Sequence, residues 1–195
     1  MESSDLRAKE FYTEFISETK TITIEVYKES KFYTKELLSA VEKILKRKGL
    51  SSSEREYFRV DLISYLNKKD EAKDLAKSVE LEHYLWDLKV AVEHENCKKS
   101  WFDEIVKLVH LRCPLKILIC YNYCDRRDDE TLGDLAKLKA CAELMGKVSA
   151  FSTADRDEYL IIVGNGYGKK EDYSTKDYRG YLYDYDEKCF KKLDR

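Results

Sequence analysis

The chain has 195 residues, of which 43% are hydrophobic and 38% are charged. This length and hydrophobic content predict one domain, residues 1–195, with a single core. The 36 Lys and Arg residues nearly balance the 38 Asp and Glu residues. The balance argues against a protein that coats nucleic acid non-specifically through a basic excess, while an enzyme with a local basic groove stays open.

The N-terminal stretch MESSDLRAKE is polar, and no run of about 18 apolar residues occurs anywhere in the chain. We therefore expect no contact with a membrane and a cytoplasmic location. The six cysteines form no C-x-x-C pair. Free thiols are the favoured interpretation, and a zinc site is the weaker alternative.

The N-terminal part predicts a helix followed by a strand. Apolar side chains recur at helical spacing over residues 5–17, and TITIEVY (21–27) alternates apolar with polar residues. A second helix is expected from Thr34, its capping residue, to Gly49, which ends it after a basic last turn. We treat the helix and strand within 5–27 as additions to a core of about residues 31–165.

The segment YFRVDLISY (57–65) follows a short polar joint and fits two structures. As a helix it aligns Phe58, Leu62 and Tyr65, with a capping box formed by Ser53 and Glu56. Its aromatic and β-branched residues favour a strand instead.

From residue 70 to 165, predicted helices and strands alternate, which is typical of an α/β fold. The tail from residue 166 to 195 is polar and rich in tyrosine, and we treat it as a further addition. The expected helices are 70–79, 100–111 and 130–145, and the expected strands are 86–94, 115–122 and 158–165.

Two glutamates stand at the end of the strand in WDLKVAVEHEN (86–96). Residues two apart on a strand share a face, so Glu93 and Glu95 point the same way while His94 points to the other side. Carboxylates this close repel each other unless a cation lies between them. A solvated strand end is the simpler explanation, and a Mg²⁺ site is the sharper one.

Asp61 favours the metal site. If residues 57–65 form a strand, Asp61 lies in mid-strand, where a lone carboxylate is costly unless it is paired or bound to a metal. Asp61, Glu93 and Glu95 would then converge on one cation.

The order of these segments resembles the PD-(D/E)xK superfamily of restriction-endonuclease-like nucleases. That superfamily has a helix, strands that carry the acidic motif, a helix and a strand. Here the corresponding segments are TKELLSAVEKILKRKG, YFRVDLISY, WDLKVAVEHEN, SWFDEIVKLVHL and LKILICYN, over about residues 31–125. The resemblance implies a three-layer core in which helices flank a central mixed sheet.

It also implies a Mg²⁺-dependent phosphodiesterase, with Mn²⁺ as a substitute ion, that acts on nucleic acid and most often on DNA. Asp61 takes the place of the first acid, Glu93 that of the (D/E)xK acid, and Glu95 that of the lysine, as in Glu-x-Glu members. A further acid from the first helix falls on Glu42, with Glu36 as second choice.

Two alternatives remain open at the level of sequence. Val60 stands where the motif has proline, and the lysine is absent. The alternative to an active nuclease is a nuclease fold without catalysis that serves as a binding or assembly module. A homodimer is also compatible with the sequence.

Overall fold

A computed structural model of the protein describes residues 6–22, 26, 29–50, 52–57, 59–82, 85–97, 99–123, 128–151, 156–166 and 177–194. One seven-stranded sheet forms the centre, and its strands lie in the order in which they occur along the chain. The strands are β1 (Ser52–Tyr57), β2 (Val60–Asn67), β3 (Trp86–Glu95), β4 (Leu115–Tyr123), β5 (Glu158–Gly166), β6 (Arg179–Asp184) and β7 (Cys189–Lys192).

The sheet is mixed. β1, β2 and β3 pair in antiparallel fashion, β3, β4 and β5 are parallel, and β5, β6 and β7 are again antiparallel. The parallel strands β4 and β5 are buried almost along their whole length, which explains their continuous apolar sequence. Because β3 and β4 are parallel, their carboxyl ends meet at one edge of the molecule.

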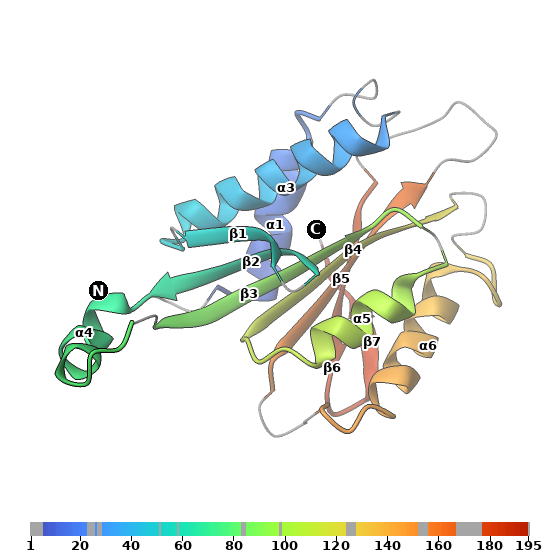
Figure 1. Ribbon diagram of the computed structural model, residues 1–195. Coiled ribbons are helices and arrows are strands. Elements are labelled where there is room, and N and C mark those ends of the chain that lie inside the picture. Colours follow the sequence, from blue (N-terminus) through green and yellow to red (C-terminus); the bar gives the residue numbers. More distant parts are fainter. Residues whose placement is uncertain are drawn as a thin grey trace.

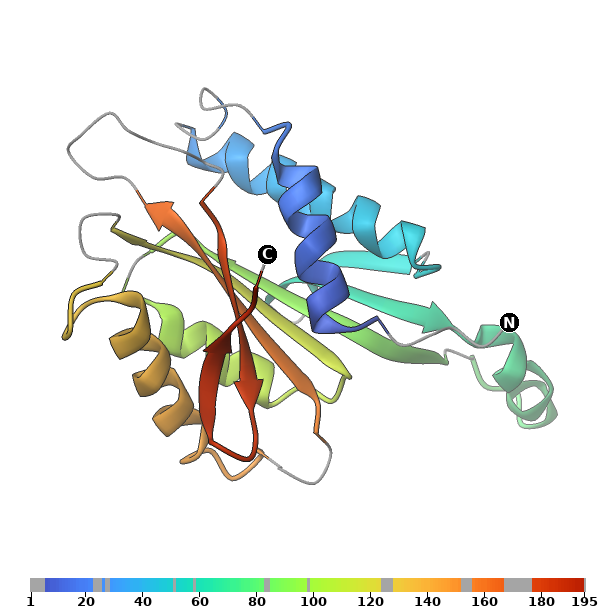
Figure 2. The same cartoon turned by 180° about the vertical axis from the view of Figure 1, so that it is seen from behind.

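Helices cover both faces of this sheet (Figures 1 and 2). α1 (Ala8–Thr19) and α3 (Ser30–Arg47) lie on one face, and α5 (Trp101–Val109) and α6 (Asp134–Met145) lie on the other. α4 (Lys69–Ser78) connects β2 to β3 and projects away from the body of the molecule. The α/β class and the helix-flanked mixed sheet are therefore as the sequence predicted.

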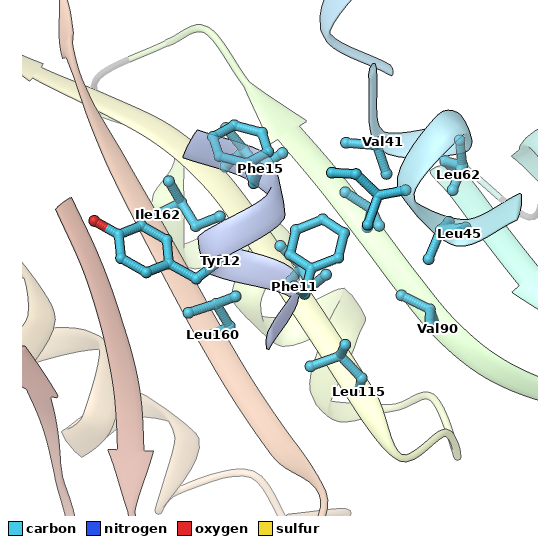
Figure 3. Packing of buried hydrophobic residues seen from close by; sticks show 14 of the residues in the cluster. Phe11, Tyr12, Phe15, Val41, Leu45, Leu62, Val90, Leu115, Leu160 and Ile162 are labelled. Carbon is cyan, nitrogen blue, oxygen red and sulfur yellow. The ribbon is translucent and has the colours of Figure 1, made fainter. Parts of the chain in front are cut away.

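The larger apolar cluster lies between α1, α3 and the sheet (Figure 3). Phe11 and Phe15 of α1 are fully buried and stack at 6.1 Å between ring centroids. Strand residues such as Leu62 and Val90 belong to the same cluster and lie beside Leu45 of α3. Burying each of these side chains contributes roughly 1.5–3 kcal/mol. This cluster holds the two N-terminal helices to the sheet.

The opposite face of the sheet packs against α5 and α6. Ala91 of β3 and Leu118 of β4 point to this side, where they meet Trp101, Ile105 and other buried residues of the two helices. Because side chains alternate along β3, Val90 and Val92 face α1 and α3, while Ala91 and Glu93 face the side of α5 and α6.

The segment 57–65 is a strand, but it begins later than predicted. Tyr57 ends β1 and Val60 begins β2, so the polar joint before it is part of a hairpin that the sequence did not indicate. Arg59, in the tight turn, has a φ of 65°. Asp61 is consequently the second residue of its strand and lies near its start.

The strand predicted for residues 21–27 is wrong in the part that the structure describes. Thr21 lies in a turn and Val26 is helical, while 23–25 and 27 lie outside the described residues. Ile22 and Val26 both pack against the core on the α1 and α3 side. Their separation of four residues suits one face of a helix as well as it suits a strand.

The C-terminal tail also differs from expectation, because it completes the sheet. β6 pairs with β5, and β7 pairs with β6. Arg179 at the start of β6 is buried and forms an ion pair of 2.7 Å with the buried Asp134 of α6. Among the described residues, no helix is both long enough and apolar enough to cross a membrane.

Candidate active site

The acidic residues meet where β2 begins and β3 ends. Leu62 and Val92 are partners in the ladder, which brings the preceding Asp61 beside the following Glu93. The backbone N–H of His94 donates to Asp61 Oδ2 at 2.6 Å, and the backbone N–H of Asp61 donates to Glu93 Oε2 at 3.4 Å. The two carboxylates are thus held in place by the hydrogen bonds of two neighbouring strands.

A lysine from the neighbouring helix completes this cluster. Lys107 Nζ on α5 lies 2.8 Å from Glu93 Oε1 and also pairs with Glu104 one helical turn earlier. It donates a third contact, of 3.0 Å, to the carbonyl oxygen of Arg59. The Glu93 side chain is 1% exposed and that of Lys107 is 34% exposed, so the ammonium lies between the buried carboxylate and solvent.

Burial raises the pKa of Glu93 to about 8. The Lys107 ammonium opposes this shift, and the charges of Glu104 and Asp61 add to it. Burial likewise raises the pKa of Asp61, against the stabilising hydrogen bond from the His94 backbone. Neighbouring acids with raised pKa values are a common property of functional sites, because each one disfavours the charge of the next.

Glu95 lies at the edge of the cluster. It is the last residue of β3 and is half-buried, and its carboxylate accepts a hydrogen bond from the backbone N–H of Cys97. Burial raises the pKa of Glu95, and the charges of Glu104 and Asp61 raise it further. The structure therefore brings Asp61 and Glu93 into direct contact and leaves Glu95 beside them.

Glu42 does not belong to this cluster. It lies on α3, on the other face of the sheet, and pairs with Arg55 of β1 at 2.8 Å. Arg55 is the ladder partner of Leu62, whose side chain belongs to the core on the α1 and α3 side. The sheet therefore separates Glu42 from Glu93, and Glu36 on the same helix is exposed.

His94 points away from the glutamates, as the strand alternation predicted. Its Nε2 lies 2.9 Å from the Tyr121 hydroxyl, which in turn donates to the Tyr33 hydroxyl. Burial lowers the pKa of His94 to about 4, so the ring is neutral at physiological pH. His94 is a packing residue of the opposite face.

The described residues contain no group of three or more His, Cys, Asp or Glu side chains arranged to hold a metal ion. A preformed three-carboxylate centre at Asp61, Glu93 and Glu95 is therefore not present. Mg²⁺, however, usually binds through one or two carboxylates and completes its shell with water and substrate oxygens. The adjacent Asp61 and Glu93 fit this smaller requirement, with Lys107 as the cation already beside them.

Sequence reasoning missed Lys107 and Glu104. Both lie on α5, which the sequence predicted as a helix, and their spacing of three residues places them on one side of it. The signal was present as a Glu and a Lys on the polar side of a helix that follows the acidic strand.

Compared with protein-family models, curated proteins and solved structures, the chain gives no significant match.

Proposed function

We propose that the protein is a metal-dependent phosphodiesterase that cleaves nucleic acid, with DNA as the expected substrate, and that its core is restriction-endonuclease-like. The observation that carries this proposal is the contact of Asp61 with the buried Glu93, beside an ammonium group, at the end of a central strand. The order α3, β1, β2, β3, α5, β4 agrees with the order of the PD-(D/E)xK core.

α4 is a departure from that core, because it is inserted between the two strands that carry the acids. The insertion lies at the far end of the hairpin, next to Asn67 and Trp86, whereas Asp61 and Glu93 lie at the opposite end. The proposal therefore does not depend on α4.

Asp61 and Glu93 are the residues that would hold Mg²⁺. When bound, the ion would lower the pKa of a coordinated water and neutralise charge on the scissile phosphate. Glu95 is half-buried and has a raised pKa, which brings it closer to the range in which a carboxylate accepts a proton efficiently. We assign Glu95 the role of general base that orients the attacking water.

Lys107 is the residue that we assign to the place of the missing motif lysine. Its ammonium lies beside the motif acid although it comes from a helix and not from β3. Lys107 also pairs with the carboxylate of Glu104, so the lysine retains a partner if Glu93 binds a metal ion instead. The role of Lys107 would be to stabilise negative charge that develops on the phosphate.

The test is a cleavage assay on single-stranded and double-stranded DNA with Mg²⁺, with Mn²⁺ and with EDTA. Asp61→Asn and Glu93→Gln should each reduce the rate by about 100-fold or more, as removal of one stabilising group does in other enzymes. Lys107→Met should lose activity but keep its Mn²⁺ binding. Glu42→Gln is the matched control and should cleave like the wild type, because Glu42 lies on the other face of the sheet.

A scaffold without catalysis is the second candidate. It is favoured by the ion pair between Lys107 and Glu93, which supplies a counter-charge without any metal. In that case no variant would differ from the wild type in the cleavage assay. Mn²⁺ would also fail to bind, because a structural ion pair needs no divalent cation.

A further inference from the structure

A pocket of about 370 Å³ lies on the other side of α5 from the acidic cluster. Its walls come from the first turn of α5, from the last residues of β4 and from α6. Asn122 and Tyr123 end β4, and Glu93 and Glu95 end the parallel strand β3, so the pocket and the acids lie at the same end of the sheet. Ligands of open α/β sheets commonly bind at this end.

Three aromatic rings line the pocket. Trp101 is 3% exposed, whereas Phe102 and Tyr123 are 44% and 37% exposed and line the same space. Lys137 Nζ lies 4.8 Å from the centroid of the Trp101 ring and donates to Asn122 Oδ1 at 2.9 Å. Large, partly exposed rings around a concave space are typical of a site for a flat apolar ligand.

The charge of the pocket is the opposite of that of the acidic cluster. Lys99 and Lys137 line it, and none of the described lining residues is acidic. This local excess of positive charge occurs in a chain whose formal net charge is −2. The pocket therefore suits a ligand that combines a planar ring with negative charge, which is the chemistry of a nucleotide.

We propose that this pocket binds one unstacked base of a single-stranded nucleic acid, whose backbone then passes Lys99 towards the acidic cluster. The proposal rests on the proposed function, because it places the substrate of the same site. α5 connects the two sites: Trp101 and Phe102 face the pocket, while Glu104 and Lys107 contact the acids. A base must leave a duplex to enter such a pocket, so a single strand is the favoured substrate.

Fluorescence of Trp101 tests this proposal directly. The chain has two tryptophans, and Trp86 lies at the opposite end of β3. A Trp86→Phe variant therefore reports on the pocket alone. In EDTA, a single-stranded oligothymidylate should quench Trp101, and a duplex of the same length should bind more weakly. An abasic oligonucleotide, which has the phosphates without the bases, should also bind more weakly.

Two further substitutions test the rings. In the same background, Phe102→Ala and Tyr123→Ala should each weaken binding of the oligothymidylate by about 5- to 150-fold, which is the range for loss of one stacking ring. Both side chains are partly exposed, so the variants should fold. Phe32→Ala removes an exposed ring from α3 on the other face and should change nothing.

Equal binding of the abasic and the base-carrying oligonucleotides would overturn the proposal, because only phosphate would then be recognised. Absence of quenching, or quenching that Phe102→Ala and Tyr123→Ala leave unchanged, would overturn it as well. Binding in EDTA requires no cleavage. A protein that binds the oligothymidylate but never cuts DNA would therefore contradict the proposed nuclease and leave the base pocket standing.

Discussion

At Glu93, burial and charge oppose each other. Its side chain is 1% exposed, the cation Lys107 lies 2.8 Å from it, and the anions Glu104 and Asp61 disfavour its charge. An isolated carboxylate is costly in such a place, and the ammonium offsets only part of that cost. The carboxyl group is therefore held closer to its neutral form than an exposed glutamate would be.

The stability of the protein should consequently depend on pH. The folded protein binds the Glu93 proton more tightly than the unfolded chain does, so the contribution of Glu93 to stability is greatest below the usual pKa of about 4.3. It should fall as the pH rises towards about 8, the pKa of Glu93 in the fold. The raised pKa values of Asp61 and Glu95 act in the same direction. The lowered pKa of His94 acts in the opposite direction between about pH 4 and pH 6.5. Urea unfolding from about pH 6.5 to pH 8 therefore measures the slope that belongs to the carboxyl groups.

Glu93→Gln isolates the part of this dependence that belongs to Glu93. The variant keeps the shape of the protonated side chain, so it should flatten the pH dependence. At pH 8 and without metal, the free energy of unfolding of the variant should be no lower than that of the wild type. It should be higher by about 1 kcal/mol for each unit by which the fold raises the pKa of Glu93. A variant that loses about 3 kcal/mol or more at pH 8 would show that the ion pair with Lys107 stabilises the fold.

At the scale of elements, α4 projects from the body of the molecule with little packing against the other described elements. It has no buried residue, Leu75 is 76% exposed, and Val79, which follows the helix, is 58% exposed. A helix of this length is marginal in water without packing. The strands on either side close the hairpin without it, because the Lys68 backbone N–H donates to the Leu85 carbonyl oxygen at 2.8 Å.

We therefore expect that residues 69–84 are dispensable for the fold. Replacement of this segment by an Asn-Gly turn should change the free energy of unfolding by no more than about 1 kcal/mol, because short hairpin loops suit this turn and none of the residues described between 69 and 82 is buried. Urea titration of both chains gives the comparison. A shortened chain that fails to fold would mean that α4 contributes to the core.

The helices and strands between residues 86 and 165 were predictable because their apolar periodicity reports burial directly. β4 and β5 show it as continuous apolar runs, and α5 shows it as a stripe. β1 was missed because SSEREY is polar, as an edge strand often is. Thr21 and Val26 were wrongly assigned to a strand, because Ile22 and Val26, four residues apart, fit a helix as well as a strand.

The candidate site was predictable only in part, for the same physical reason. Asp61 and Glu93 share a sheet, so strand alternation was enough to bring them together. Lys107 and Glu42 lie on helices, and the face that each helix covers depends on packing between segments far apart in the chain. Sequence periodicity indicates which side of a helix is buried but does not say against which face of the sheet.

At the scale of the whole molecule, the C-terminal strands connect the last helix to the sheet. Arg179 of β6 pairs with Asp134 of α6, and both side chains are at most 4% exposed. Arg179 Nη1 donates to Asn165 of β5 at 2.8 Å. One buried guanidinium thus joins α6, β5 and β6, and it ties the C-terminal strands to the rest of the sheet.

Arg179→Ala should therefore cost about 3–5 kcal/mol, because it leaves the Asp134 carboxylate buried without its cation. Arg7→Ala is the matched control: Arg7 pairs with Glu158 at 2.8 Å but is 72% exposed, so its loss should cost at most about 1 kcal/mol. Chemical denaturation of the two variants and the wild type separates these values. Equal costs for both would contradict the assigned role of Arg179.

The central claim is that Asp61 and Glu93 form a divalent-cation site, and a thermal melt with Mn²⁺ tests it most directly. At about 100 times the dissociation constant, Mn²⁺ should stabilise the wild type by about 2.7 kcal/mol. For a chain of this length, that free energy corresponds to a rise of about 5 °C or more in Tm. Glu42→Gln should show the same rise, and Asp61→Asn should show none. A wild-type Tm that does not respond to Mn²⁺, together with a Glu93→Gln variant that melts lower in EDTA, would contradict the claim and leave Glu93 as one half of a structural ion pair.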